Sequence, residues 1–262
     1  MTLAIDFIPL MLLSINADST ALRSIAPIPL EIQVVNWDVV DGTSSGKQDA
    51  LPGEQREVVL NDGFWIGKYE LTKSQNVRKR WRPIENEVKT APLVDMHWDD
   101  GRRMIFRTLT EDERRAGRLP VSWQYDLPSE EQWEYAARAG TTTHFYFGDD
   151  LDQLTRHGNF ADKSFYETKD IFSNHAHRTL DDGFATLAPV GSFQANPWGL
   201  HDVYGNIYEW CRDHGARGGS WITVPENCCS AYRDHYSSRD NQIYLGYRIV
   251  IQPNVPDPKS KK

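Results

Sequence analysis

Residues 199–210 read Gly199-Leu-His-Asp-Val-Tyr-Gly-Asn-Ile-Tyr-Glu-Trp210, and this stretch contributes most to deciding the fold. Gly205-Asn206 is a turn dipeptide, because both residues tolerate the left-handed backbone that tight turns need. Ile207, Tyr208 and Trp210 follow at once, and we expect Trp210 to pack in the core. The stretch therefore predicts a tight turn that leads directly into aromatic packing.

Outward from this stretch, the chain has the composition of an ordinary globular protein. It has 262 residues, of which 39% are hydrophobic and 25% charged, which suits one large domain or two small ones. With 18 Gly and 14 Pro, a fibrous or disordered chain is excluded. Because we find no tandem repeat and no linker, we predict a single α+β domain over 31–252. Residues 1–30 form an N-terminal segment, and the polar tail 253–262 is expected to be disordered.

Charge and hydropathy limit the kinds of partner and the membrane segments that we expect for this protein. The 29 Lys and Arg against 37 Asp and Glu give a net charge of −8, and no basic stripe is present, so we expect no nucleic-acid partner. No run of 18 apolar residues occurs, which predicts no transmembrane segment. The apolar start from Leu3 to Ile15 is interrupted by Asp6 and Pro9 and has no preceding basic residue. It is therefore either an export signal or a first strand.

Three segments have the Ser/Thr-x-x-Glu/Gln pattern of a helix capping box. They start at Thr72, Thr110 and Ser129, and the third is the clearest, because Trp133, Ala136 and Ala137 follow at helical spacing. Glycines at 117 and 140 are expected to end the second and third helices. Strands are predicted at 31–35, 58–60 and 64–69, the last two around the turn 61–63. Beyond residue 141 we find no long helical period.

The three cysteines exclude a disulfide-dense scaffold. Cys228 and Cys229 are adjacent, and a bond between neighbours would be strained, so each either pairs elsewhere or stays free. The pairing of these two residues with Cys211 stays open at this point.

Four stretches in order resemble one family. Besides residues 199–210, they are 64–72 (FWIGKYELT), 127–138 (LPSEEQWEYAAR) and 217–221 (RGGSW) followed by 246–248 (GYR). Together they resemble the formylglycine-generating-enzyme family, also called the sulfatase-modifying-factor domain, over roughly residues 55–251. The resemblance implies a single α+β domain, a variant of the C-type-lectin fold with little regular secondary structure. Together with the apolar start, it favours an exported or periplasmic protein over a cytoplasmic one.

The resemblance also implies two calcium ions. Calcium accepts six to eight oxygens from mixed donors in irregular loops, although ordinary turn and capping chemistry explains the same residues. Asp202 stands where the family can have Asn, which keeps an oxygen and adds charge. The first implied site comprises Asn159, Phe160, Asp182 and Phe184, and the second Asp202, Gly205, Ile207 and Glu209, with the Phe, Gly and Ile residues serving through their carbonyls.

The family's best-known member oxidises a cysteine of an unfolded sulfatase segment to formylglycine, using O₂ and a copper(I) ion held by two thiolates. The resemblance puts Thr223 at the first thiolate position and Cys228 or Cys229 at the second, close to Ser220 of the Gly-Gly-Ser motif. A hydroxyl cannot replace a thiolate as a soft ligand for Cu⁺. Three functions therefore stay open: a sulfatase-maturing oxidoreductase with altered metal ligation, a non-catalytic binding module, and a structural domain of an exported assembly.

The segment 232–244 has the composition of a recognition surface. It is rich in Tyr, Ser, Asp, Asn and Arg, and Tyr gives rigid amphipathic area while Ser and Asn give adaptable hydrogen bonds. A polar loop packed on the core is the alternative. A sulfatase-type or other peptide segment is the implied ligand, and the candidate groove residues are Trp221, Thr223, Arg233, Tyr236 and Tyr244.

Overall fold

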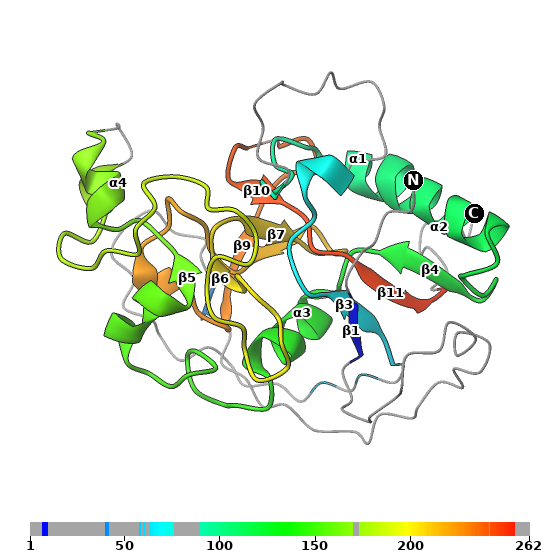
Figure 1. Ribbon diagram of the computed structural model, residues 1–262, viewed down its shortest axis with the longest axis horizontal. Helices are drawn as coiled ribbons and strands as arrows, with labels where there is room; N and C mark the ends of the chain where they lie inside the picture. The colour runs from blue at the N-terminus through cyan, green and yellow to red at the C-terminus, as the bar shows by residue number, and fades with distance from the viewer. Residues whose placement is uncertain are drawn as a thin grey trace.

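A computed structural model describes residues 7–9, 40–41, 58, 60, 63–75, 90–169, 173–240 and 242–254. The predicted strand at 31–35, the tail after residue 254 and all of the N-terminal segment except 7–9 lie outside the described residues. The described residues mix short helices with short strands, as predicted for an α+β domain (Figure 1).

A four-stranded antiparallel sheet joins residues from both ends of the described chain. Its order is β1 (Phe7–Pro9), β3 (Trp65–Gly67), β11 (Val250–Pro253) and β4 (Trp123–Asp126). Val250 faces Ile66 on one side and Asp126 on the other. Pro253 pairs with Trp123 as the last residue of β11, and the Asn254 backbone N donates to the Ser122 carbonyl at 2.8 Å.

A five-stranded sheet carries the rest of the motifs. Its order is β10 (Leu245–Gly246), β7 (Tyr208–Trp210), β8 (Gly215–Arg217), β9 (Tyr232–His235) and β2 (Val40–Asp41). The central pairs are antiparallel, and the two edge pairs are parallel. A separate parallel pair joins β5 (Gly158–Asn159) to β6 (Tyr204–Gly205). The stretch 199–210 thus supplies β6, a tight turn and β7.

Helix α3 (Glu130–Arg138) begins where its capping box predicts. Ser129 Oγ accepts from the Gln132 backbone N at 3.2 Å, and Gln132 Oε1 accepts from the Ser129 backbone N at 2.8 Å. The helix ends at Ala139, which has a φ of 48°, and Gly140 follows with a φ of 89°. Both predicted ends of this helix are confirmed.

The prediction of a helix starting at Thr110 is wrong. Helical structure starts twelve residues earlier and runs through α1 (Trp98–Asp100), a π-helical segment η3 (Gly101–Phe106) and α2 (Arg107–Arg115). Thr110 lies inside α2, where its Oγ1 accepts from the Tyr125 backbone N at 3.0 Å. Burial of Ile105 and Phe106 stabilises the upstream helix that the capping pattern does not reveal.

Elsewhere the helices are short, as predicted. They are η2 (Lys73–Gln75), η4 (Leu151–Arg156), α4 (Lys163–Glu167), η5 (Ser173–His175) and η6 (Pro225–Asn227). At the Thr72 pattern only half of a capping box forms, because Gln75 Oε1 accepts from the Thr72 backbone N at 2.9 Å while the Thr72 hydroxyl bonds the same oxygen. The hairpin expected around 61–63 is wrong, since β3 pairs with β1 and β11 and neither Val58 nor Leu60 is in a strand.

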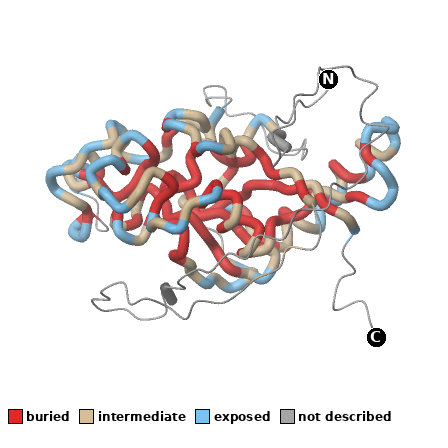
Figure 2. Tube along the Cα trace, turned by 90° about the horizontal axis from the view of Figure 1, so that it is seen from below, coloured by how far each residue is buried: buried red, intermediate tan, exposed pale blue. Residues whose placement is uncertain are grey.

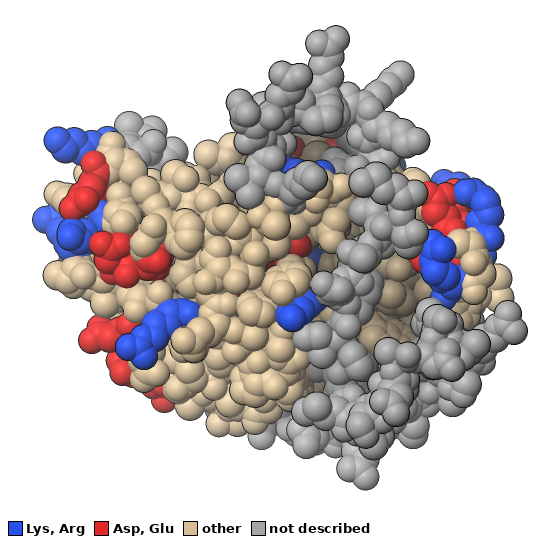
Figure 3. Space-filling model, viewed as in Figure 1, with Lys and Arg blue, Asp and Glu red and all other residues tan. Residues whose placement is uncertain are grey.

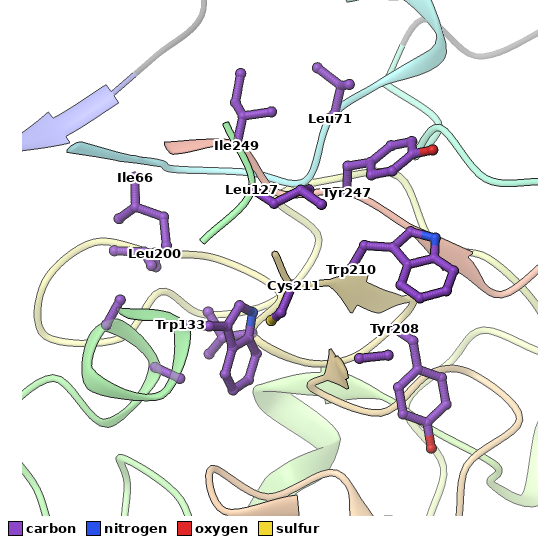
Figure 4. Close-up of a cluster of buried hydrophobic side chains, with 14 of the residues drawn as sticks. Ile66, Leu71, Leu127, Trp133, Leu200, Tyr208, Trp210, Cys211, Tyr247 and Ile249 are labelled. Carbon is purple, nitrogen blue, oxygen red and sulfur yellow. The ribbon is translucent and has the colours of Figure 1, made fainter. Parts of the chain in front are cut away.

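Aromatic side chains fill the core between the sheets and α3. Trp133 and Trp210 are fully buried and point into the cluster drawn in Figure 4, which confirms the core position predicted for Trp210. Trp65 is only half-buried and packs edge-on against Trp123, with ring centroids 4.7 Å apart. Figure 2 shows the buried trace running through the middle of the molecule, with exposed segments at its two ends.

Charges on the face drawn in Figure 3 are mixed in sign. Over α2 and α4, Lys and Arg lie beside Asp and Glu, and ion pairs such as Arg107–Glu111 and Lys163–Glu167 join them. Among the helices of the described residues, none has the length and apolar character needed to cross a membrane.

Candidate functional site

The Gly-Gly-Ser motif packs its backbone directly against a cysteine. Gly218 and Gly219 have φ values of 93° and 78°, a conformation that favours glycine. A Cβ placed on Gly219 would lie 2.5 Å from Cys228 Sγ. The motif is therefore glycine-rich because the chain leaving β8 must pass close to the segment after η6.

Thr223 is buried in a chain of hydroxyl groups. Its Oγ1 accepts from the Ser220 backbone N at 3.0 Å and lies 2.9 Å from Ser220 Oγ. The Thr223 side chain also lies near the Tyr208 hydroxyl, which in turn lies near that of Tyr232. The position that the resemblance gives to a copper thiolate is thus integrated into a hydroxyl network.

All three cysteines are buried and free, which resolves the pairing left open by the sequence. Burial raises the pKa of the Cys211 and Cys228 thiols well above the usual value, and that of Cys229 as well. Cys228 Sγ lies 3.9 Å from the Thr223 carbonyl oxygen. Because the thiolate is the form that binds metal and reacts, protonated buried thiols are poor nucleophiles and poor ligands.

Four tyrosines, 208, 232, 236 and 244, form what we call the tyrosine cluster. The Tyr208 ring centroid lies 5.8 Å from that of Tyr236 and 6.4 Å from that of Tyr244. Tyr208 is fully buried, whereas Tyr236 and Tyr244 are partly exposed. Burial and the Asp234 charge raise the pKa of Tyr232 to about 12, so its hydroxyl stays protonated at neutral pH.

The structure brings most of the predicted groove residues together. Thr223, Tyr236 and Tyr244 meet around Tyr208, and Tyr244 also packs against the small cluster that contains Trp221. Trp221 is buried, with its ring edge-on to Phe165 at 5.2 Å, and its Nε1 has no hydrogen-bond partner.

Arg233 is the predicted groove residue that lies elsewhere. Successive residues of a strand face opposite sides, so Arg233 of β9 points away from Tyr232 and Asp234. Its Nη2 donates to Glu130 Oε1 at 2.9 Å. Arg233 therefore belongs to the ion pairs that join β9 to α3.

A buried ion-pair network fixes the segment after the cysteines. Arg217 pairs with Glu134 of α3. Arg217 also donates to three backbone carbonyls, those of Ser230 at 3.1 Å and of Ala231 and Tyr232 at 3.0 Å each. This guanidinium thus positions β9 and, through it, the tyrosine cluster.

The first implied calcium site offers suitable oxygens. Asp182 accepts from the backbone N of Phe160 and of Phe184, each at 2.9 Å, which gathers three of the four predicted residues. The fourth, Asn159, has a buried Oδ1 without a hydrogen-bond partner. Burial raises the pKa of Asp182 to about 7, and the nearby Asp162 charge adds to the rise. A carboxylate short of positive charge, bonded to the segment that carries an unpartnered amide oxygen, fits a hard cation.

Sequence reasoning missed Asp162 beside this site. One of its oxygens accepts from the Asp182 backbone N at 2.7 Å, and the other caps α4 at the Phe165 backbone N. The local signal was an Asp three residues before Phe165 at a short helix start.

The second implied site fits in part. Asp202 accepts one backbone N–H at each oxygen, from Gly191 at 2.5 Å and Phe193 at 3.2 Å. Glu209 is fully engaged: Arg248 donates to both of its oxygens at 2.8–3.0 Å, and Trp133 Nε1 donates at 2.5 Å. Asp202 keeps free lone pairs for a metal, but Glu209 in this arrangement does not.

The turn between Asp202 and Glu209 is packed tightly against β5. Gly205 and Asn206 both have positive φ, 78° and 60°, as the turn prediction requires. A Cβ on Gly205 would lie 1.9 Å from the Asn159 carbonyl oxygen, so only glycine fits. The Asn159 Nδ2 donates to Asn206 Oδ1 at 3.0 Å, which links the two implied calcium loops.

Glu70 is a buried acid that sequence reasoning also missed. Its Oε2 accepts from Asn206 Nδ2 at 2.9 Å, and its Oε1 has no hydrogen-bond partner. Burial, together with the charges of Asp202 and Glu209, raises the pKa of Glu70 well above its ordinary value. The available signal was an acidic residue inside the apolar stretch 64–72.

Within the described part of the chain, no three His, Cys, Asp or Glu side chains gather in a way that could hold a metal. A cation held by the loops above would therefore need amide or backbone oxygens in addition to carboxylates, as calcium sites commonly have.

Comparison with known proteins finds one matching family model and several similar sequences. A family model described as the sulfatase-modifying factor enzyme 1-like domain matches residues 38–253. A formylglycine-generating enzyme of Thermomonospora curvata is 38% identical over 89 residues, which are 33% of this chain and 26% of that protein. The inactive C-alpha-formylglycine-generating enzyme 2 of Mus musculus is 33% identical over 184 residues, 60% of this chain and 52% of the relative.

The first curated formylglycine-generating enzymes are matched over 26%, 51% and 45% of their own lengths, so the chain spans at most about half of each. Among solved structures, PvdO from Pseudomonas aeruginosa superposes with a TM-score of 0.61 at 21% identity and covers 86% of this chain and 93% of that one. At this identity the similarity concerns the fold alone.

Proposed function

This chain belongs to the sulfatase-modifying factor family, and we propose that it is a calcium-stabilised member that binds a peptide-like ligand at the tyrosine cluster without copper-dependent oxidation. The observation that carries the proposal is the Thr223 hydroxyl, which stands at the implied first thiolate position, is hydrogen-bonded to Ser220 and lies near Tyr208. The alternative is a sulfatase-maturing oxidoreductase that uses the two remaining cysteines.

The surroundings of the cysteines argue against copper chemistry. Copper(I) prefers soft thiolate ligands, and a hydroxyl oxygen is a hard donor. Cys228 packs closely against Gly219, and burial raises the pKa of the Cys228 thiol. Forming a thiolate at Cys228 is therefore costly. Cys229 is buried as well. A relative that carries the name of an inactive formylglycine-generating enzyme supports the proposal that members of this family exist without the oxidase activity.

The tyrosine cluster supplies what a ligand site needs. Tyr236 and Tyr244 are partly exposed, and their rings rest on the buried Tyr208. Protonated tyrosine hydroxyls donate hydrogen bonds, and their rings give apolar area at a low entropic cost. A peptide segment, with backbone carbonyls and apolar side chains, matches both features. We therefore assign the role of ligand contact to Tyr236 and Tyr244, with Trp221 and Thr223 behind them.

Calcium would stabilise the loops that support this cluster. The first set fits best, with Asp182 and Asn159 as side-chain ligands and Phe160 and Phe184 as carbonyl ligands. A domain with such short strands gains stability from an ion that binds the folded chain but not the unfolded one. When bound, the ion supplies charge that the buried Asp182 carboxylate otherwise lacks.

Copper(I) titration with oxygen uptake tests the absence of oxidase activity. The purified chain, a sulfatase-type cysteine peptide and the matched variants Thr223→Cys and Thr223→Ser are compared. We expect no copper uptake and no turnover for the wild type and Thr223→Ser, and copper binding for Thr223→Cys, because it restores a second soft ligand. One equivalent of copper and peptide turnover in the wild type would refute the proposal.

Fluorescence anisotropy tests the ligand site. The probe is a labelled sulfatase-type peptide in which serine replaces the reactive cysteine, so that binding is measured without chemistry. We expect Tyr236→Phe and Tyr244→Phe each to weaken binding about fivefold, the effect of losing one hydrogen bond worth about 1 kcal/mol. Tyr135→Phe is the matched control, because Tyr135 lies on α3 against Trp198. Equal binding by all three variants and the wild type would refute the assigned surface.

A further inference from the structure

We propose that Asp234 makes the tyrosine cluster selective for a ligand that carries a cationic side chain, such as that of lysine or arginine. The inference rests on the proposed function, because it specifies the class of ligand that the same site takes. Asp234 belongs neither to the groove residues that the composition of segment 232–244 indicates nor to the implied ligand sets.

Strand register places Asp234 on the aromatic face of the five-stranded sheet. Trp210 of β7 pairs with Ala216 of β8, and Ala216 pairs with Asp234 of β9. Paired residues of neighbouring strands lie on the same face, and residues two apart along a strand share that face. Tyr208 and Tyr232 therefore belong to it as well. On this face, β7 and β9 present aromatic side chains and one carboxylate.

The opposite face of the sheet holds the neighbouring cations. Arg217 of β8 pairs in register with Arg233 of β9. Their guanidinium groups bond to Glu134 and Glu130 of α3, respectively. Both cations therefore point away from Asp234. Within the described ranges, no Lys, Arg or His side chain forms an ion pair with Asp234, so its carboxylate is available to a cation from outside.

Asp234 lies close to every ring of the tyrosine cluster. Burial is the main reason why the pKa of each of its four tyrosines is raised, and the Asp234 charge adds to the rise at all four. Asp234 Oδ1 accepts from the His235 backbone N at 2.8 Å, and the Tyr236 hydroxyl lies close to the carboxylate. Since Asp234, Tyr236 and Tyr244 are all partly exposed, a ligand at the cluster would cover the carboxylate together with the rings.

A cation is the ligand group that this arrangement favours. Covering a carboxylate with an uncharged group removes its water without replacing the lost hydrogen bonds, which weakens binding. A cation compensates for that loss by forming an ion pair, and the faces of tyrosine rings attract it further. An anionic group would be repelled. The site therefore discriminates among cationic, apolar and anionic side chains.

Asp240 adds a second negative charge beside the cluster. Its Oδ2 accepts from the Ser237 backbone N at 2.7 Å. The Asp240 charge contributes, after burial and the Asp234 charge, to the raised pKa of Tyr244. The adjacent Arg239 is exposed, and in the part of the chain that the structure describes it forms no ion pair with either carboxylate. Two carboxylates thus act on the partly exposed Tyr244 ring, which strengthens the attraction for a cation.

A buried donor next to Tyr244 suits the backbone of the same ligand. Tyr244 packs against the main core and also against the small cluster that contains Trp221. Only 8% of Trp221 is exposed, and its Nε1 has no hydrogen-bond partner among the described residues. An indole N–H is a donor only, and a peptide carbonyl oxygen would satisfy it. The site thus offers an acceptor for a cationic side chain and a donor for the backbone that carries it.

Fluorescence anisotropy with matched peptides and the full chain tests the inference. Each probe is a pentapeptide amide, Gly-Ala-X-Ala-Gly, with a fluorophore on its N-terminus, so that only the guest residue X changes. The guest is lysine, arginine, glutamate or norleucine, which has the lysine stem without the charge. We expect the wild type to bind the lysine and arginine probes about tenfold more tightly than the norleucine probe, and the glutamate probe most weakly.

Charge-neutral variants identify the residue that confers the preference. Asp234→Asn keeps the size of the side chain and removes its charge, so it should bind the cationic probes as weakly as the norleucine probe, with unchanged affinity for norleucine. Asp112→Asn, an exposed change on α2, removes the same charge elsewhere and should keep the wild-type preference. In the wild type the preference should fall severalfold from about 0.05 to about 0.5 M salt, because salt screens exposed charges.

The outcomes separate this inference from the proposed function. Equal binding of the four probes by the wild type overturns the inference, as does a failure to bind any of them or a cationic preference that persists in Asp234→Asn. None of these results decides the proposed function, which depends on the sulfatase-type peptide and the Tyr236→Phe and Tyr244→Phe variants. If Asp234→Asn does not fold, Asp234→Ser replaces it in the same comparison, and a wild-type preference that is insensitive to salt overturns the ion pair.

Discussion

Replacing Gly219 by alanine should destabilise the fold strongly, because two separate costs act at this position. Gly219 has a φ of 78°, and an L-residue in the left-handed region costs roughly 1–2 kcal/mol. A Cβ would also lie 2.5 Å from Cys228 Sγ and 3.1 Å from its Cα. Overpacking of a buried site adds roughly 1–3 kcal/mol, for a total of about 2–5 kcal/mol.

Thermal unfolding followed by circular dichroism measures this loss. At about 2–4 °C per kcal/mol for a domain of this size, the melting temperature of Gly219→Ala should fall by roughly 4–20 °C. Gly117→Ala is the matched control, since its φ is 71° and nothing lies within 4 Å of the added Cβ. It should show the backbone cost alone. Equal losses in the two variants would refute the close approach of the Gly-Gly-Ser backbone to Cys228.

Three further predictions concern stability. Ser129→Ala removes the cap of α3 and should cost about 0.5–2 kcal/mol in urea unfolding, with no change expected if the box does not form. Arg217→Met removes the partner of one Glu134 oxygen, leaving only Arg138 on the other, and it frees three buried carbonyls; it should cost about 3–5 kcal/mol, and a neutral effect would contradict the network. The pKa of Asp182 is about 7 in the fold, above its unfolded value, so without calcium the folded state binds the extra proton. Stability in EGTA should therefore fall as pH rises from about 4 to 7, and Asp182→Asn should flatten this dependence in urea midpoints measured across that range.

Local signals predicted α3 and failed at α2 for the same reason. A capping box acts over three residues, so Ser129-Glu-Glu-Gln132 specifies its own helix start. Thr110 has the same pattern, but burial of Ile105 and Phe106 extends the helix upstream of it. A pattern that spans four residues cannot report packing contributed by the preceding turns.

Strand pairing was beyond the sequence because it is non-local. Strand β3 lies within the predicted strand 64–69, yet its neighbour β11 lies about 185 residues later in the chain. The turn 61–63 suggested a hairpin instead. The alternation of side chains along a strand also explains why Arg233 lies outside the groove. The composition of segment 232–244 placed it among the groove residues, but in β9 its side chain is on the face opposite to Tyr232.

The calcium residues illustrate a related difficulty. The resemblance placed Asp202 and Glu209, which are close in sequence, in one implied set. In the fold, Glu209 is taken by Arg248, and Glu70 approaches the same turn from a segment more than 130 residues away. Which acid faces a turn depends on packing between distant segments, and no local pattern encodes it.

The residues that make this family recognisable are, in this chain, mainly those that replace regular secondary structure. Arg217 satisfies three backbone carbonyls, Arg248 satisfies those of Gly67 and His201, and Asn206 joins two loops to Glu70. With strands of two to four residues, few ladder bonds are available, so buried side chains must complete the hydrogen bonding of the backbone. A substitution at such a residue disrupts the fold, whereas Thr223 can differ from cysteine and still be accommodated by Ser220 and Tyr208. The motif resemblance therefore identifies the scaffold, whereas the chemistry of this chain depends on position 223 and the tyrosines around it.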